Sequence, residues 1–198
     1  MAGPLLVATT NAGKLREIRD ILRGVGVDLR SLAEVPPVAE PEEHGETFAA
    51  IARDKAAAYA HATGLVTVAE DSGLEIDALD GAPGVRSARF PGDTYPEKFA
   101  NIYRLLEERG ASGSPARFVC ALAVAAPDGR VLFEARGVVE GEITRPPRGD
   151  GGFGYDPIFY YPPMGLTLAE VPAAAKAAVS HRGAAFRQLR AWLEHGHP

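Results

Sequence analysis

The chain has 198 residues, of which 46% are hydrophobic and 24% charged, and its 21 Lys and Arg against 26 Asp and Glu give a formal net charge of -5. This balance argues against a disordered chain and is typical of one globular domain, or of two small lobes that share a core. No apolar run approaches the ~18 residues of a membrane helix, and the first residues lack the cationic region of a secretory signal. We therefore expect a cytoplasmic protein that binds neither membrane nor nucleic acid, in which a local basic cluster meets any anionic ligand.

Hydrophobic periodicity in the first third of the chain predicts strands that alternate with helices. In chain order we expect a strand over 4–8, a helix after residue 14, a strand over 27–32, an exposed loop over 33–45, a helix over 46–63 and a strand over 65–69. The helix over 46–63 is alanine-rich without internal Gly or Pro, and Gly64 would end it. Its apolar face includes one cation, Lys55.

The rest of the chain combines short elements with a long hairpin. We expect a break at 70–73, a resumed strand over 74–78, a loop over 80–93, a helix over 95–109, strands over 117–126 and 131–143, a loop over 144–154, a strand over 155–160 and a helix over 183–194. These elements predict a mixed α/β or α+β fold around one mixed sheet, as a single domain over 1–198, and their order is compatible with two lobes and a cleft. Cys120 lies in an apolar strand and is expected to be a small buried hydrophobe.

The segment Thr9-Thr10-Asn11-Ala12-Gly13-Lys14 runs from the first strand into a helix N-terminus. Backbone N–H groups and the helix dipole favour a phosphate there, and Lys14 adds positive charge. The segment is not a Walker A motif, because Leu15 stands where Ser or Thr would follow the lysine. The same residues also fit an ordinary capped helix.

Two adjacent acids, Glu70 and Asp71, follow an apolar strand and precede Ser72. Mg²⁺ takes one or two protein carboxylates and completes its shell with water and phosphate oxygens, so one more carboxylate from Glu42 or Glu43 would suffice. An acidic turn without a ligand is the alternative. Ser72 is not a predicted nucleophile, because no Gly-x-Ser-x-Gly elbow surrounds it.

Glycines surround the aromatic pair Phe153 and Tyr155 just before a predicted strand. A Phe between glycines can expose its face for base stacking, although a β-bulge with a core Phe fits the same pattern. Lys176, His181 and Arg182 place cations ahead of the last helix, and Lys55 is either a further cation of this set or a snorkelling side chain. The other histidines, His44, His61, His195 and His197, lack metal-ligand spacing.

Seven motifs in one order resemble a known family, the Ham1-like noncanonical purine nucleoside triphosphate pyrophosphatases. They are Thr9-x-Asn11-x-x-Lys14, Glu43-x-Gly45-x-Thr47-Phe48 with Lys55-Ala56, Asp71-Ser72-Gly73-Leu74, Gly81-Ala82-Pro83-Gly84, Ser87-Ala88-Arg89, Gly152-Phe153-Gly154-Tyr155-Asp156-Pro157, and Lys176 with Ser180-His181-Arg182-Gly183. The chain departs from the family pattern at Glu70, where Asp is usual, at Ile51, where Asn is usual, and at Ala174 and Ala175, where acids are usual.

The resemblance implies an elongated mixed sheet flanked by helices, with two lobes, an active-site cleft and a homodimer. It also implies Mg²⁺-dependent hydrolysis of dITP, ITP and XTP to the monophosphate and pyrophosphate. By this reading Asp71 is the catalytic base, a metal ligand or both, with Glu43 or Glu42 as the second ligand. The implied substrate-binding residues are Thr9, Thr10, Asn11, Ala12, Gly13, Lys14, Lys55, Ser72, Phe153, Gly154, Tyr155, Asp156, Lys176, His181 and Arg182.

Two other functions stay open on the residues alone. A metal-dependent phosphatase or pyrophosphatase that accepts pyrimidine nucleotides would use the same acids and lysines without needing Phe153 together with His181 and Arg182. A nucleotide-binding regulator would keep the basic cluster and the stacking Phe, but would have no reason to place Asp71 near a phosphate.

Overall fold

The computed structural model describes residues 3–42 and 44–196 of the chain. Its strands are β1 (Leu5–Val7), β2 (Leu29–Ser31), β3 (Val66–Ile76), β4 (Ser114–Ala125), β5 (Val131–Ile143), β6 (Phe159–Tyr161) and β7 (Leu166–Thr167). Its α-helices are α1 (Ala12–Ile21), α2 (Phe48–Thr63), α3 (Tyr95–Glu108), α4 (Ala173–Val179) and α5 (His181–Glu194). No helix within the described ranges is long and apolar enough to span a bilayer.

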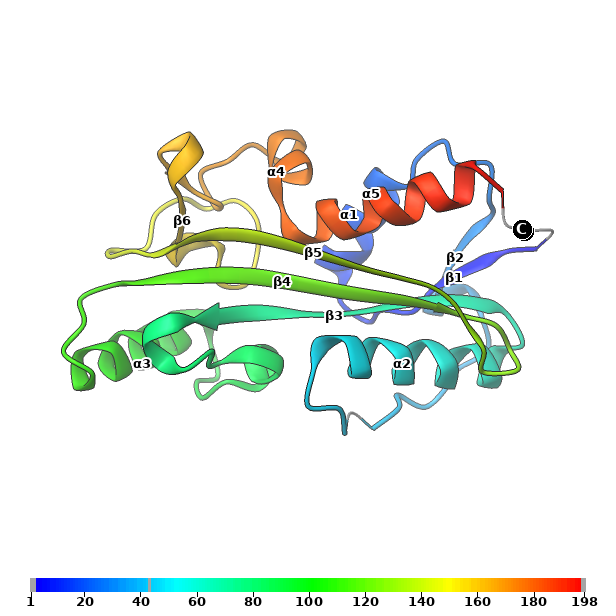
Figure 1. Ribbon diagram of the computed structural model, residues 1–198, viewed down its shortest axis with the longest axis horizontal. Helices are drawn as coiled ribbons and strands as arrows, with labels where there is room; N and C mark the ends of the chain where they lie inside the picture. Colours follow the sequence, from blue (N-terminus) through cyan, green and yellow to red (C-terminus); the bar gives the residue numbers. More distant parts are fainter. Residues whose placement is uncertain (1–2, 43, 197–198) are drawn as a thin grey trace. The chain divides into compact units, whose positions relative to one another are not determined.

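The described strands form one seven-stranded sheet in the order β2-β1-β3-β4-β5-β6-β7 (Figure 1). The sheet is mixed, because β1 pairs in parallel with β2 and β3, whereas β6 pairs antiparallel with β5 and β7. This arrangement confirms the predicted fold class, a mixed sheet flanked by helices. The predictions of a single domain over 1–198 and of a cleft stay predictions.

The chain divides into two compact units, and three strands contribute to both of them. Unit 1 comprises the residues up to Asp71, Cys120–Gly137 and the residues from His181 onward. Unit 2 comprises Ser72–Val119 and Val138–Ser180. The strands β3, β4 and β5 therefore each begin in one unit and end in the other.

Unit 1 has helices on both faces of its part of the sheet (Figure 1). On one face, Ile18 and Leu22 of α1 and Phe186 of α5 pack against alternate strand residues such as Leu5 and Val68. On the other face lies α2, where Ala52, Ala56 and Ala60 recur every four residues and are fully buried. Strand β1 is buried on both sides, which explains why its sequence is a continuous apolar run rather than an alternating one.

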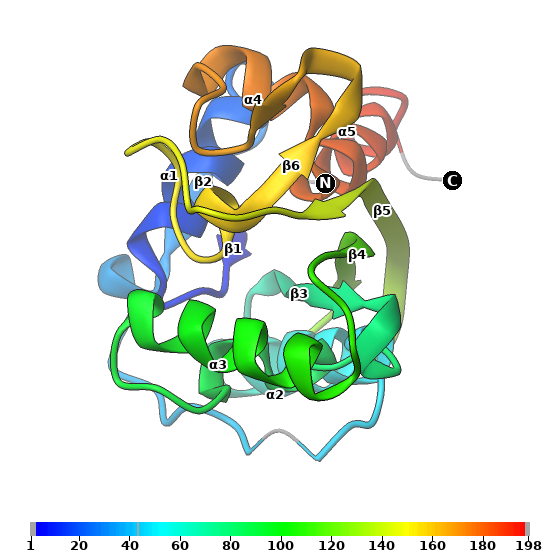
Figure 2. The same cartoon turned by 90° about the vertical axis from the view of Figure 1, so that its left-hand side faces the viewer.

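Unit 2 has a single apolar core, with α3 on one side of its part of the sheet and α4 on the other (Figure 2). Phe99, Ile102 and Leu106 of α3 point into this core at helical spacing. The rings of Phe118 and Phe159 lie with their centroids 4.6 Å apart. The core fixes α3 and the segment that follows β5, both of which carry residues discussed below.

Most predicted elements are present, including the β1–α1 unit, α2, α3 and the hairpin of β4 and β5. Three predictions were wrong. Strand β3 continues through residues 70–73 instead of breaking, because the two acids there are buried rather than solvated. The expected loop over 80–93 holds a 3₁₀ helix, Gly84–Arg89, and the expected strand over 155–160 begins with a 3₁₀ turn, Asp156–Ile158, where Pro157 favours helical φ.

Candidate active site

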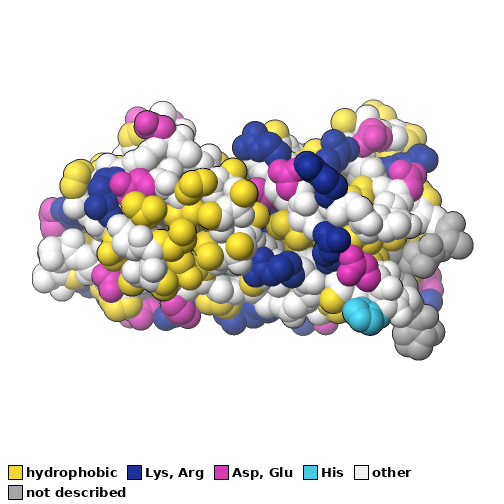
Figure 3. Space-filling view, turned by 90° about the horizontal axis from the view of Figure 1, so that it is seen from above, with side chains coloured by type: hydrophobic (Ala, Val, Ile, Leu, Met, Phe, Trp, Pro, Cys, Tyr) yellow, Lys and Arg dark blue, Asp and Glu magenta, His cyan; other side chains and the backbone are white. Residues whose placement is uncertain are grey.

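The loop between β1 and α1 carries the predicted phosphate-binding residues at the start of α1. Asn11 is the N-cap, and its side-chain oxygen accepts a hydrogen bond from the Lys14 backbone N–H at 3.0 Å. The Asn11 N–H in turn bonds Thr9 Oγ1 at 3.2 Å. Thr10, Asn11 and Ala12 are exposed, so this helix start is accessible to an anion. The space-filling view shows Lys and Arg side chains, interspersed with acidic ones, on the face that carries α1 and α5 (Figure 3).

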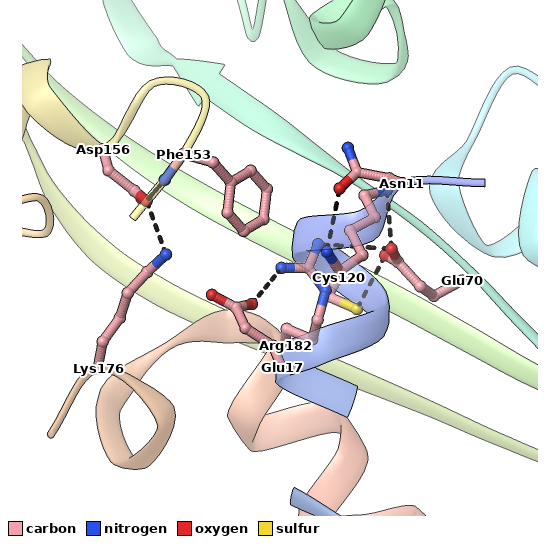
Figure 4. A network of polar contacts seen from close by, with 9 residues as sticks. Asn11, Glu17, Glu70, Cys120, Phe153, Asp156, Lys176 and Arg182 are labelled. Carbon is pink, nitrogen blue, oxygen red and sulfur yellow. Dashed lines mark hydrogen bonds and ion pairs between the residues drawn. The ribbon is translucent and has the colours of Figure 1, made fainter. Parts of the chain in front are cut away.

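The buried carboxylate of Glu70 joins three elements of unit 1 (Figure 4). Glu70 Oε1 lies 2.7 Å from Lys14 Nζ and 3.4 Å from Arg182 Nη2. The other guanidinium nitrogen, Arg182 Nη1, bonds Glu17 Oε2 at 2.7 Å. The side chains of Glu70 and Arg182 are each 2% exposed. Two cations and two anions therefore balance one another, which is the condition under which such charges can be buried.

The thiol of Cys120 belongs to the same network, with Sγ 3.4 Å from Glu70 Oε2. Burial, and then the negative charge of Glu70, raise the pKa of this thiol well above its ordinary value. The thiol stays protonated and donates a weak hydrogen bond to Glu70. Burial by itself would lower the pKa of the Arg182 guanidinium, but Glu70 and Glu17 raise it above its ordinary value, so the side chain is charged.

Asp71 follows Glu70 in β3 and is 9% exposed. Within the described ranges no group of three or more His, Cys, Asp or Glu side chains forms a ready-made metal cage. Mg²⁺ does not need one, since it is usually held by one or two carboxylates, and Asp71 supplies an oxygen donor of that kind. Glu42 is exposed and lies 2.9 Å from His44 Nε2, and Glu43 lies outside the described residues.

Lys55 is half-buried on α2, beyond the Thr47 N-cap that accepts a hydrogen bond from the Ala50 N–H. The helix buries Phe48, Ala52 and Tyr59 on the face that Lys55 shares, whereas Ala62 is exposed.

A second buried ion pair lies in unit 2 and supports Phe153 (Figure 4). Asp156 Oδ2 accepts hydrogen bonds from Lys176 Nζ at 2.6 Å and from the Phe153 N–H at 2.8 Å. Lys176 Nζ lies 4.7 Å from the centroid of the Phe153 ring, a cation–π contact. One carboxylate thus fixes both the backbone of Phe153 and the ammonium beside its ring. Phe153 itself is half-buried.

The remaining predicted residues have individual settings. Tyr155 is buried, and its hydroxyl donates to the Ser87 carbonyl at 2.8 Å. His181 and Arg182 form the first turn of α5 instead of preceding it, whereas Lys176 lies on α4. Ser72 is half-buried in β3, and Gly154 has a positive φ of 69°.

The structure brings the predicted residues together in two sets. Lys14 and Arg182 meet at Glu70 in unit 1, and Phe153, Asp156 and Lys176 meet in unit 2. The sequence analysis missed Glu17 as the partner of Arg182, and it considered Glu70 only beside Asp71 as an acid for a cation, not as the partner of Lys14 and Arg182. The spacing of Lys14 and Glu17, three residues apart, indicates only that the two share a helix face and does not point to Arg182 or Glu70.

The chain is similar in sequence and in structure to known proteins. The Ham1 family model matches residues 5–192. A dITP/XTP pyrophosphatase of Nostoc sp. is 50% identical over 186 residues, which cover 93% of this chain and 91% of the relative. A solved Ham1 protein from Coxiella burnetii is 40% identical with a TM-score of 0.89, covering 98% of this chain and 100% of that chain. A nucleoside-triphosphatase / dITP/XTP pyrophosphatase from Mycobacterium abscessus is 40% identical with a TM-score of 0.73, covering 95% and 97%. Since the family model matches nearly all of its length and its fold matches solved Ham1 proteins, the chain belongs to the Ham1 family.

Proposed function

We propose that this protein is a nucleoside triphosphate pyrophosphatase that hydrolyses dITP, ITP and XTP to the monophosphate and pyrophosphate with Mg²⁺. The observation that carries the proposal is the 50% identity, over more than nine-tenths of both chains, to a relative named dITP/XTP pyrophosphatase. We further propose that the protein acts in the cytoplasm as a homodimer, cleansing the nucleotide pool.

The residues of unit 1 would bind the triphosphate. The exposed start of α1 offers backbone N–H groups, and Lys14 and Lys55 offer compensating charge. Lys14 pairs with Glu70 at 2.7 Å in the structure, so a phosphate would compete with this carboxylate for the ammonium. Arg182 lies 3.4 Å from the same Glu70 oxygen and would keep that carboxylate compensated while Lys14 turns toward the phosphates.

Asp71 would carry the chemical step. A carboxylate held there can take the proton of a water that attacks the α-phosphorus, as the bond from that phosphorus to the bridging oxygen breaks and pyrophosphate leaves. Mg²⁺ bound by Asp71 and by Glu43 or Glu42 would neutralise charge on the phosphate oxygens.

The residues of unit 2 would bind the base. Phe153 is held by its backbone bond to Asp156 and would stack the purine. Asp156 and Lys176, with Gly154 and Tyr155, would line the edge of the base. His181 and Arg182 stay predicted readers of the 6-oxo group. The structure gives both terminal nitrogens of Arg182 carboxylate partners, so a base contact would require Arg182 to share its guanidinium.

The experiment that tests this function measures pyrophosphate released from dITP, XTP, dATP, dGTP and dCTP, with Mg²⁺ and with EDTA. We expect rapid turnover of dITP and XTP, little of the other three, and none in EDTA. Comparable turnover of dCTP would instead indicate a broad phosphatase, and binding of dITP without turnover would indicate a regulator.

Asp71→Asn is expected to lower kcat by about two to four orders of magnitude while the Kd for dITP stays within about tenfold, because a base acts mainly in the transition state. The matched control is Asp128→Asn, which changes an exposed carboxyl in the β4–β5 turn and should leave kcat unchanged. Near-native turnover in Asp71→Asn would end the proposed role of Asp71.

A further inference from the structure

Tyr95 is an exposed aromatic residue whose hydroxyl lies beside Gly154, the residue that follows Phe153. It is the first residue of α3, and its side chain is among the few large hydrophobic ones that stay exposed, at 40%. A Cβ built on Gly154 would stand only 3.6 Å from Tyr95 Oη. Tyr95 and Gly154 both belong to unit 2, as do Phe153, Asp156 and Lys176.

The ring of Tyr95 is held in place by its neighbours. Its centroid lies 5.4 Å from that of Tyr155 at an interplanar angle of 89°, and 6.2 Å from that of Phe99. Lys98 Nζ lies 5.4 Å from the same ring. The backbone is fixed by the capping box of Thr94 and Glu97 at the start of α3. These contacts explain the position of the Tyr95 ring, and a phenylalanine ring would make the same packing contacts.

The hydroxyl has no such explanation. Tyr103 donates its hydroxyl to the Thr144 carbonyl and Tyr155 donates to Ser87, but in the described part of the chain the Tyr95 hydroxyl makes no hydrogen bond. Burial, and then the charge of Asp156, raise the pKa of Tyr95 above its ordinary value. The Tyr95 hydroxyl is therefore a protonated donor beside the segment that carries Phe153. It also lies close enough to the Asp156 carboxylate, which bonds the Phe153 N–H, for that charge to affect its pKa.

We propose that Tyr95 is a further substrate-binding residue, whose hydroxyl hydrogen-bonds the edge of the purine while the base lies on Phe153. The inference rests on the proposed function and adds a base contact to it. A Cβ at Gly154 would be in ordinary van der Waals contact with Tyr95 Oη, so the hydroxyl lies directly beside the residue that follows Phe153. A phenolic O–H can both donate and accept, so it suits an oxo group or a ring nitrogen of the base.

The decisive variant is Tyr95→Phe, which removes the hydroxyl and keeps the ring. Removing a contact that is made equally in the ground state and the transition state raises KM and leaves kcat unchanged. We expect the KM for dITP and XTP to rise about 3- to 10-fold, the range of one hydrogen bond. Inorganic tripolyphosphate, used as a competitive inhibitor, has no base, so its inhibition constant should not change.

Tyr103→Phe is the matched control, because Tyr103 also belongs to α3 but its hydroxyl bonds the Thr144 carbonyl. It should leave the KM for dITP unchanged. An unchanged KM in Tyr95→Phe, a fall in kcat with KM constant, or an equal loss of tripolyphosphate inhibition would each overturn the inference. If the wild-type protein turns over neither dITP nor XTP, the proposed function has failed, and calorimetric titration of dITP in EDTA still decides whether Tyr95→Phe weakens base binding.

Discussion

Asp156 shows how much of the proposed base-binding set, Phe153, Asp156 and Lys176, depends on one buried carboxylate. Its Oδ2 accepts from both Lys176 Nζ and the Phe153 N–H, and its side chain is 3% exposed. The residue opposite is Gly152, which has a φ of 68°. A Cβ at position 152 would overlap Asp156 Oδ2 and stand 2.9 Å from Asp156 Cγ. The absence of a side chain at Gly152 is therefore what lets Asp156 reach both donors.

Gly152→Ala is expected to raise the KM for dITP at least about tenfold, because displacing the carboxylate frees both Lys176 and the Phe153 backbone and costs the charged hydrogen bonds between them. Gly110→Ala controls for backbone strain, since Gly110 has a φ of 70° in the same unit and nothing within 4 Å of its Cβ position. Steady-state kinetics of the two variants checks the prediction. Equal KM values in both would show that strain, and not the clash with Asp156, is responsible.

The packing of α5 against β5 depends on a close approach of two backbones. An added Cβ at Gly137 would overlap the His181 carbonyl oxygen and stand 2.6 Å from the Ala185 nitrogen. Both are backbone atoms of the first turns of α5, so they cannot rotate aside as a side chain would. The absence of a side chain at Gly137 therefore lets the first turn of α5, which carries His181 and Arg182, pack closely against β5 in unit 1.

Gly137→Ala is expected to lower the free energy of unfolding by about 3 kcal/mol, the cost of overpacking a site that cannot relax. Gly26→Ala is the control, because Gly26 is exposed and has nothing within 4 Å of its Cβ position, so it should be neutral within about 0.5 kcal/mol. Urea unfolding of both variants measures the difference. A Gly137→Ala protein as stable as the control would contradict the close contact.

The protein as a whole is expected to lose stability in alkaline solution. Burial raises the pKa of Tyr103 to about 12, even though the nearby charge of Arg145 acts to lower it, from an ordinary value of 10.0. Between these two pH values the unfolded chain loses the phenolic proton and the folded protein keeps it, so the free energy of unfolding falls as pH rises from 10 to 12. The net charge of -5 at neutral pH also grows more negative there, which adds repulsion throughout the molecule.

Tyr103→Phe should therefore show a shallower fall of unfolding free energy over this pH range than the wild-type protein. The Tyr103 side chain is only partly buried, so solvent screening reduces the difference to a fraction of what full burial would give. Urea titrations at several pH values between 9 and 12 give the two slopes. Parallel curves would mean that Tyr103 does not titrate differently in the folded and unfolded states.

Local patterns in the sequence determined the elements that bury one periodic face. The apolar run at β1, the cap at Asn11, the alanine repeat of α2 and the turn between β4 and β5 each depend on residues close together in the chain, which is why they could be predicted. The motif order was likewise enough to suggest the Ham1 family, because motifs are read directly from the sequence.

Tertiary contacts decided the rest. Glu70 and Asp71 look like a polar break after a strand, but Lys14 and Arg182, far away in the chain, compensate the charge of Glu70 and let β3 continue through them. The pairing of Arg182 with Glu17, and the approach of Tyr95 to Gly154, also join residues distant in sequence. No local pattern reports which buried charges will meet, because a charge is stable inside a protein only when the fold supplies its partner.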